Sequence, residues 1–180
     1  MKNALLHICC AVCAAGSIQR LREDGYEVTG FFYNPNIHPE EEYKKRLEAA
    51  KGAAKSMGFE LIEGHYDKDG WALSVKGLEK EPEGGRRCEV CFKIRLSAAA
   101  GLARDKGFGY FATTLSISPY KNTKVINEIG DSLGHGSFLA YDFKKNDGFK
   151  RTMDFAKGHN LYRQHYCGCV FSENKNIRSS

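Results

Sequence analysis

The 180-residue sequence has no stretch that approaches the roughly 20 consecutive apolar residues of a membrane-spanning helix. It also has no low-complexity segment and no internal repeat. Its apolar and charged fractions are those of an ordinary globular protein. A chain of this length buries a full hydrophobic core, and we therefore expect a single domain over residues 1–180 with no membrane contact.

The amino terminus has a superficial likeness to a secretory signal, because an apolar run follows Lys2. Its apolar segment, residues 4–13, is short, follows a single basic residue and contains His7 and two adjacent thiols. A buried strand explains this segment better, and we predict a cytoplasmic protein. Strong charge bias is absent too: 27 basic and 22 acidic residues leave a net charge of +5, which permits a polyanionic partner without requiring one.

Strand-like and helix-like patterns alternate along the chain. Strands are predicted at 4–9, 26–33, 59–66, 109–115 and 137–143. Helices are predicted at 14–23, 38–57, 67–78, 88–106, 119–133 and 147–157. This alternation indicates right-handed βαβ units and a parallel sheet. An irregular tail that carries cysteines follows the last helix.

The simplest arrangement of these elements is an α/β fold, a Rossmann-like doubly wound sheet in a three-layer α/β/α sandwich. The expected strand order is 3-2-1-4-5, in which the connections diverge between the first and fourth strands. Ligands bind at such a point, beyond the carboxyl ends of the strands. The first strand ends at Cys9, and the segment 113–122 follows the fourth, so both are predicted to border one site.

Cysteine is the unusual element of the composition. Seven cysteines cannot all pair internally, and disulfides are rare in a reducing compartment. They fall in three groups: Cys9-Cys10-x-x-Cys13, Cys88-x-x-Cys91 and Cys167-Gly168-Cys169. Isolated buried cysteines would not cluster in this way, and a redox C-x-x-C motif explains only one group. We therefore predict metal-binding segments at 9–13, 88–91 and 167–169.

The number of thiols predicts more than one metal centre. A structural zinc site or an iron–sulfur cubane takes four protein ligands, and seven thiols exceed either. On an extended backbone, Cys9 and Cys10 would point to opposite faces and serve two neighbouring centres. This favours a cluster of about four thiolates beside a second metal. Basic residues flank the second motif and can offset the negative charge of the thiolates: Arg86, Arg87, Lys93 and Arg95.

Five motifs occur in order between Leu5 and Ser172: LLHICCAVC, GFFYNPNIHPEEEYKKR, GLEKEPEGGRRCEVCFKIRL, TTLSISPYKN and LYRQHYCGCVFS. Their combination resembles the epoxyqueuosine reductases of the QueH type. The resemblance implies a HUP-type Rossmann-like fold and an oxidoreductase that reduces epoxyqueuosine in the transfer RNA anticodon to queuosine without cobalamin. It implies a [4Fe-4S] cluster and an adjacent mononuclear iron as cofactors. The partners are then transfer RNA that contains epoxyqueuosine and an electron donor that the sequence does not identify.

Within this interpretation the thiols are divided between two centres. The cluster is predicted to take Cys10, Cys88, Cys91 and one thiol of the Cys-Gly-Cys motif. The second metal is predicted to take Cys9 and the other thiol of that motif, with Cys13 as a further candidate. The candidate catalytic thiols are Cys9, Cys13 and Cys169.

Polar and aromatic side chains near the same edge are the candidate substrate-binding residues: Asn34, Asn36, Tyr43, Thr114, Ser116, Ser118, Tyr120 and Arg163. Amides can read a base edge, hydroxyls can reach a ribose or the epoxide, an aromatic ring can stack on an extruded base, and a cation can hold phosphate. Turn formation and core packing account for the same residue types as well.

Two other functions remain open at this stage. A transfer RNA sulfur-transfer enzyme of HUP fold would also join a cluster to nucleic acid, but it needs a phosphate loop like S-G-G-x-D-S after the first strand, where CCAVCAAGS stands here. A non-catalytic, zinc-stabilised RNA-binding module is the other alternative. Metal content tests the module, because zinc alone favours it and iron with sulfide argues against it. ATP-dependent labelling of transfer RNA with sulfur would indicate the sulfur-transfer enzyme.

Overall fold

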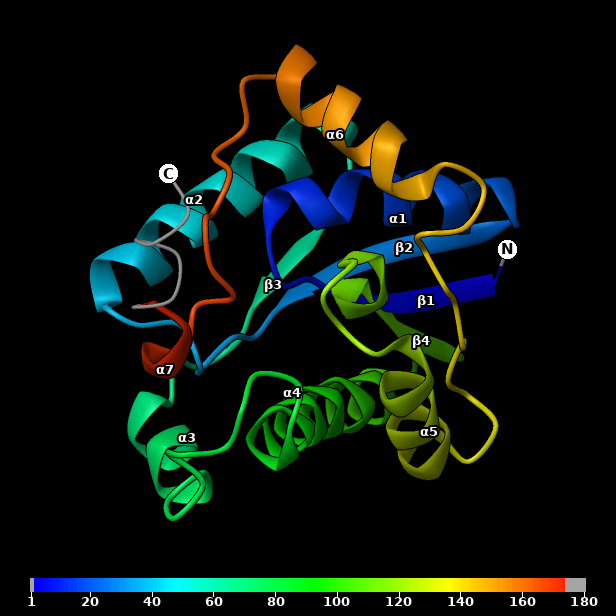
Figure 1. Ribbon diagram of the computed structural model, residues 1–180. Helices are drawn as coiled ribbons and strands as arrows, with labels where there is room; N and C mark the ends of the chain where they lie inside the picture. The colour runs from blue at the N-terminus through cyan, green and yellow to red at the C-terminus, as the bar shows by residue number, and fades with distance from the viewer. Residues whose placement is uncertain (1, 174–180) are drawn as a thin grey trace.

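The computed structural model describes residues 2–173 and contains a four-stranded parallel sheet (Figure 1). The strands are β1 (Lys2–His7), β2 (Tyr26–Phe32), β3 (Leu61–Glu63) and β4 (Tyr110–Thr113). Their order is β3-β2-β1-β4, and every neighbouring pair is parallel. The α/β fold class and the order of the first four strands are confirmed. The prediction of one domain over 1–180 extends beyond the described residues.

The predicted fifth strand is wrong in extent. Only one isolated parallel bridge, between Phe111 and Phe138, joins the segment 137–143 to the edge of the sheet. The Leu139 N–H still donates to the Phe111 carbonyl, at 2.8 Å, but the Tyr141 N–H donates to the Leu139 carbonyl, at 2.9 Å. The backbone therefore turns on itself after a single bridge, and the ladder cannot continue.

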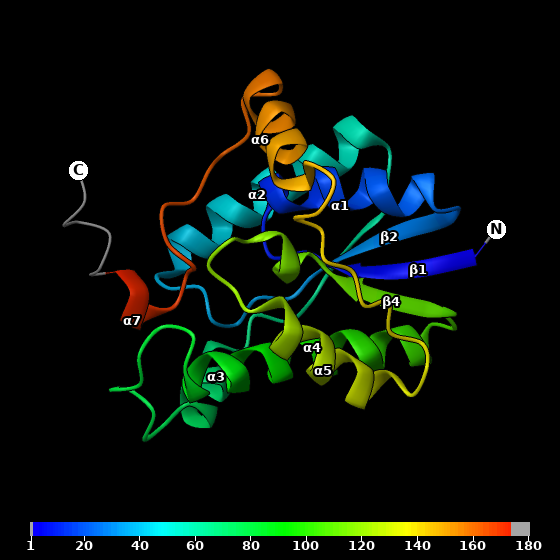
Figure 2. The same cartoon turned by 45° about the vertical axis from the view of Figure 1, so that its right-hand side comes forward.

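Helices cover both faces of the sheet, as Figures 1 and 2 show. On one face lie α1 (Ala11–Glu23) and α2 (Glu40–Met57), with α6 (Gly148–Gly158) packed outside α1. On the other face lie α4 (Arg86–Asp105) and α5 (Thr123–Gly134). The short helices α3 (Lys68–Ser74) and α7 (Val170–Glu173) lie near the end of the sheet to which β1 and β2 point. No helix in residues 2–173 is long and apolar enough to span a membrane.

Two hydrophobic clusters fill the layers on either side of the sheet. Leu6, Ile8 and Ile18 belong to the cluster beneath α1 and α2, and Leu5 and Leu96 to the cluster against α4 and α5. Because successive side chains of β1 enter opposite clusters, its residues Ala4, Leu5 and Leu6 are all apolar and buried, as the sequence pattern indicated. The strand is thereby fixed at the centre of the sheet with its carboxyl end between two layers.

Helix starts differ from the sequence prediction where cysteines are concerned. Helix α1 begins at Ala11, three residues before the predicted start, because the Cys10 side chain caps it and accepts the Cys13 N–H at 3.3 Å. Helix α4 begins at Arg86 and not at Cys88. As a result Cys13, Cys88 and Cys91 all lie in the first turns of helices, where side-chain directions are defined by the helix.

Candidate metal centre

The first thiol group consists of Cys9, Cys10 and Cys13. Their three sulfur atoms lie within 4.8 Å of one another, and the Cys9 and Cys10 sulfurs are 3.9 Å apart. A tetrahedral metal that binds thiolates at about 2.3 Å holds its sulfurs about 3.8 Å apart. The prediction that Cys9 and Cys10 point to opposite faces is wrong, because the backbone turns from strand to helix between them. The group can converge on a single metal ion.

Hydrogen bonds within this group favour one thiolate. Thiol hydrogen bonds from Cys10 and Cys13, with help from the charge of Lys121 and the Thr114 hydroxyl, hold the pKa of Cys9 well below its usual value. Hydrogen bonds with Cys10 and Cys9, together with burial, raise the pKa of Cys13. The Thr114 Oγ1 donates to the Cys9 sulfur at 3.2 Å and accepts the Cys9 N–H at 3.0 Å. Cys9 is therefore the anionic member to which a metal binds most readily.

The second thiol group consists of Cys88, Cys91, Cys167 and Cys169, which line one cavity. The first two come from the start of α4, and the other two from the tail that precedes α7. A hydrogen bond from the Cys169 thiol, the charge of Lys121 and the Ser172 hydroxyl outweigh burial and lower the pKa of Cys167 well below its usual value. Four thiols around one cavity match the ligand count of an iron–sulfur cubane.

Arg46 brings the tail to this cavity. Its guanidinium donates to the carbonyls of Tyr166 and Cys167, both at 3.0 Å, and to the Glu42 carboxylate at 2.7 Å. Only 2% of the arginine is exposed. This role of Arg46 was not among the sequence-based predictions, although its four-residue spacing from Glu42 and its position on the apolar stripe of α2 are signals of it.

The Cys-Gly-Cys turn itself requires glycine. Gly168 has a φ of 114°, a conformation that strains other residues, and a Cβ there would lie 2.8 Å from the Ile37 Cγ1 atom. The Gly168 carbonyl also accepts the His38 N–H at 2.7 Å. The turn therefore packs against the loop after β2 and is hydrogen-bonded to it, and these contacts determine where both tail thiols lie.

Some predicted substrate-binding residues lie at the thiols. Asn36 and Tyr120 line the cavity of the second thiol group. Thr114 contacts Cys9 directly, and the Ser118 hydroxyl accepts the Tyr120 N–H at 3.3 Å at the start of the same loop. Tyr120 is 86% exposed and Asn36 is buried with its side-chain oxygen unpaired among residues 2–173. Asn36 and Tyr120 thus lie at the second thiol group, and Thr114 lies at the first.

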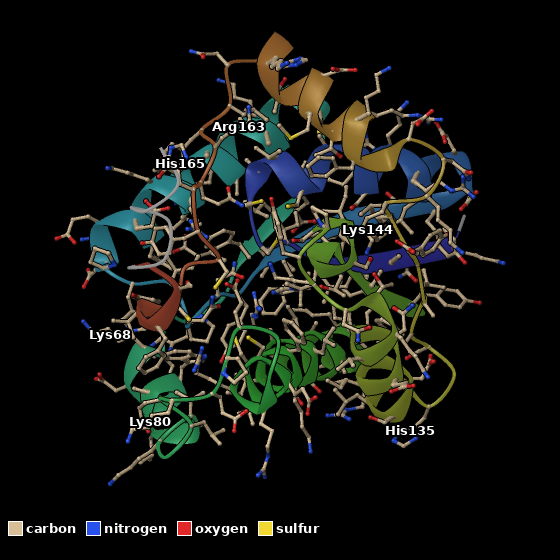
Figure 3. The ribbon with its side chains drawn as sticks, viewed as in Figure 1. Lys68, Lys80, His135, Lys144, Arg163 and His165 are labelled. Carbon is tan, nitrogen blue, oxygen red and sulfur yellow. The ribbon has the colours of Figure 1, made fainter. Side chains whose placement is uncertain are left out.

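Other predicted residues lie away from the thiols or are used by the fold. Tyr43 is buried and stacks on Tyr66 with ring centres 3.9 Å apart. Ser116 is buried and accepts the Phe143 N–H at 3.5 Å. Asn34 donates to the Ile8 carbonyl at 2.9 Å and so braces the end of β1. Arg163 is exposed on the tail beside α2 (Figure 3).

His7 ties three strands together below the first thiol group. Its ring nitrogens lie 2.9 Å from the Thr113 hydroxyl and 3.0 Å from the Tyr33 carbonyl oxygen. Burial, and then the charge of Arg95, lower its pKa to about 4. The imidazole is therefore neutral near pH 7 and holds the ends of β1, β2 and β4 in register.

The cavity also contains residues to which the sequence analysis gave no role or a different one. Trp71 is buried against Cys91 and Cys169, and its indole N–H has no hydrogen-bond partner in residues 2–173. Lys121 lines the cavity and its charge acts on both Cys9 and Cys167. Nothing in the sequence around Trp71 indicates its place, because α3 reaches the cavity only through the tertiary fold.

Fold and site together define a Rossmann-like α/β protein with a cysteine-rich candidate metal centre at the carboxyl ends of its strands. A solved structure of similar fold is the U34-tRNA thiolase NcsA from Methanococcus maripaludis with its [4Fe-4S] cluster. The TM-score is 0.58 at 15% identity, over 95% of this chain and 61% of that chain. At this identity the likeness establishes the fold alone.

The sequence assigns the family. The model of the family described as "Epoxyqueuosine reductase QueH" matches residues 4–175. A relative of that name from Streptococcus pyogenes serotype M1 is 38% identical, and the match covers 94% of this chain and 70% of the relative. A relative from Acinetobacter baylyi is 40% identical, and the match covers 93% of this chain and 79% of the relative. The relative from Thermotoga maritima is 36% identical, and the match covers 96% of this chain and 91% of the relative.

This chain belongs to the epoxyqueuosine reductase QueH family. The predicted family and the predicted enzyme class, an oxidoreductase named for the reduction of epoxyqueuosine, are thereby confirmed. The family assignment favours this activity over sulfur transfer and over a non-catalytic zinc module.

Proposed function

We propose that this chain converts epoxyqueuosine in transfer RNA to queuosine with an iron–sulfur cluster and an adjacent iron. The epoxide oxygen leaves as water, which consumes two electrons from an external donor and two protons. The observation that carries the proposal is the occurrence of a three-thiol group and a four-thiol group beyond the carboxyl ends of the strands. Because the substrate is transfer RNA, we place the reaction in the cytoplasm.

The spacing of the thiols supports a division of ligands that differs from the sequence-based one. We assign the single iron to Cys9, Cys10 and Cys13, whose sulfurs have the separation of one metal's ligands. Three protein ligands leave a position open for a substrate oxygen. We assign the cluster to the second thiol group, whose four members match a cubane. Cys10 thus moves from the cluster to the single iron, and Cys169 from a catalytic position to the cluster.

When bound, the two metal centres would supply the electrons and a Lewis acid for the epoxide oxygen. The chain's own residues supply positioning. Thr114 orients the Cys9 sulfur through its hydroxyl, and the neutral His7 fixes the strand end from which Cys9 projects. Lys121 adds a positive charge that faces both thiol groups, at a place where negative charge develops on the departing oxygen.

Base recognition is proposed at the mouth of the cavity. The exposed ring of Tyr120 offers a stacking surface to the modified base or its neighbour. The unpaired side-chain oxygen of Asn36 can accept one hydrogen bond from a donor on the base, which would also satisfy a buried polar atom. Arg163 on the tail is a candidate phosphate contact, outside the cavity.

The decisive experiment is anaerobic reconstitution with iron and sulfide, followed by incubation with a chemical reductant and transfer RNA that contains epoxyqueuosine. We expect about five irons and four sulfides per chain. Mass analysis of the nucleosides should show the loss of one oxygen. A colourless protein that holds only zinc would support the non-catalytic module, and ATP-dependent incorporation of sulfur into transfer RNA would support the thiolase alternative.

A further inference from the structure

Arg95 lies on the face of α4 that carries the second thiol group. It follows Cys88 by seven residues and Cys91 by four, which places all three on one side of the helix. All three line the same cavity, and Arg95 is only 4% exposed. A guanidinium stays charged at every pH that a protein tolerates, so this cavity contains a permanent buried cation.

The charge of Arg95 has no anionic partner among residues 2–173, where no carboxylate lies within 4.0 Å of it. Its polar contacts are long: the Nε atom donates to the Cys91 carbonyl at 3.4 Å, and the Nη1 atom to the Asn34 side-chain oxygen at 3.5 Å. Contacts at these distances stabilise weakly. Because an unpaired buried charge is costly, such a residue is retained where an anion compensates it.

The other buried arginines show what a compensated guanidinium looks like in this protein. Arg46 forms an ion pair with Glu42 and two short bonds to tail carbonyls. Arg87 donates to three carbonyl oxygens between 2.6 and 3.1 Å and lies 4.7 Å from the centre of the Phe171 ring. Arg46 thus has a carboxylate partner, and the Arg87 Nη1 atom has short hydrogen bonds, although the Arg87 Nε atom is unpaired among residues 2–173. Arg95 has a ring contact too, with its guanidinium 5.8 Å from the centre of the Phe92 ring, but it has neither a carboxylate partner nor a short hydrogen bond among these residues.

We propose that Arg95 is the counter-cation of the metal cluster held by the second thiol group and that it raises the reduction potential of that cluster. This inference rests on the cluster assignment of the proposed function. Four thiolates give a cubane a net negative charge, and one-electron reduction adds another negative charge. A fixed cation in the same low-dielectric cavity stabilises the reduced form more than the oxidised form. Arg95 is thus a positioning residue that acts through the cluster.

A second feature of the cavity acts in the same direction. Trp71 packs against Cys91 and Cys169, and its indole N–H is unpaired among the described residues. An N–H that donates to a cluster sulfur withdraws electron density and also raises the potential. Since the hydrogen bond carries no full charge, its contribution is smaller than that of Arg95.

The test is a redox titration of the reconstituted protein, followed by electron paramagnetic resonance, with iron and sulfide counted in every sample. Arg95→Gln should shift the midpoint potential to a more negative value. Arg95→Lys, which keeps the charge, should remain closer to the wild type. The matched control is Lys93→Gln, two residues earlier on α4 but exposed, which should leave the potential unchanged.

The outcomes separate this inference from the proposed function. A wild-type protein that binds no iron and sulfide overturns the function on which the inference rests. A loaded Arg95→Gln variant with the wild-type potential, or a Lys93→Gln variant with an equal shift, overturns the role of Arg95 alone. If Arg95→Gln loses the cluster, Arg95→Lys must retain it, and loss in both variants contradicts a role that depends on charge.

Discussion

The two thiol groups are built in opposite ways. The first group comes from five consecutive residues, 9–13, at the turn between β1 and α1, and the Cys10 side chain itself caps the helix. The second group combines the start of α4 with a tail about 75 residues later, held in place by Arg46 and Gly168. A local group depends on one turn, whereas an assembled group depends on the whole fold around it.

The largest effect is expected from removal of one ligand in each group. Cys10→Ala should lose the single iron and keep the sulfide, whereas Cys91→Ala should lose most of the sulfide and iron. Each variant should reduce turnover by at least about 100-fold, because ligand loss costs more than the loss of a residue that supports a ligand. Iron and sulfide counts, with nucleoside mass analysis, check this. Equal losses of both elements in both variants would contradict the division of the thiols.

Arg46→Gln should distinguish the assembled group from the local one. It leaves the Glu42 carboxylate buried without its cation and releases two tail carbonyls, at a cost of about 3–5 kcal/mol of unfolding free energy. The second thiol group should bind its cluster poorly while the first still binds one metal ion. Denaturant unfolding and metal counts measure both effects. The exposed neighbour Lys44→Gln serves as control, and similar behaviour of the two variants would exclude this role of Arg46.

Tyr120→Ala should weaken the binding of substrate and leave both thiol groups intact. The ring is exposed at the mouth of the cavity, and loss of base stacking costs about 1–3 kcal/mol of binding free energy. Binding of transfer RNA at fixed salt, compared with Tyr120→Phe, measures this. The phenylalanine variant should bind as the wild type does. A wild-type affinity in the alanine variant would place the base elsewhere.

Thr114→Val should act on the first group alone, with an effect similar in size to that of Tyr120→Ala. Loss of the hydroxyl removes two hydrogen bonds at Cys9 and should raise the pKa of that thiol, so metal binding weakens by about 10–100-fold. Binding of cobalt to the metal-free protein gives the affinity. The variant Thr114→Ser keeps a hydroxyl at this position and serves as the control. An unchanged affinity in Thr114→Val would show that the hydroxyl does not support the site.

The same cobalt titration should depend on pH in the first group. The pKa of Cys9 is lowered, whereas that of Cys13 is raised. A hydrogen bond from Cys13 lowers the pKa of Cys10, but the Cys9 thiolate and burial outweigh it and raise that pKa to about 12. A metal must therefore displace protons from Cys10 and Cys13 near neutral pH, and its affinity should rise as pH rises. A pH-independent affinity would contradict this distribution of protons.

Much of the fold follows from local patterns. The apolar run of β1, the helical periodicity of α2 and the alternation of elements predict the sheet order through β4. The fifth strand could not be predicted in the same way, because its pairing ends where the Tyr141 N–H bonds back within its own segment. The side-chain pattern of residues 137–143 does not predict that backbone turn.

The candidate site also has some features that local sequence predicts and others that depend on the tertiary structure. Sequence spacing identified the seven cysteines and the segment after β4, because short motifs keep their residues close in space. It could not show that Cys9 and Cys10 converge, since an adjacent pair diverges on a strand and converges at a turn. It also gave Trp71 no role and separated neither Arg95 nor Arg46 from exposed basic residues, because burial depends on neighbours that are distant in the chain.

By itself the sequence determined the family, the parallel α/β architecture and the three places where thiols occur, since each is written in consecutive residues or regular periods. Only the tertiary structure decided that the thiols gather as three and four, that the tail docks on α2 and that the Arg95 guanidinium is buried in the cavity of the second thiol group without a carboxylate partner among residues 2–173. These depend on contacts between α2, α4 and the tail, and such contacts exist only once the hydrophobic layers have packed around the sheet.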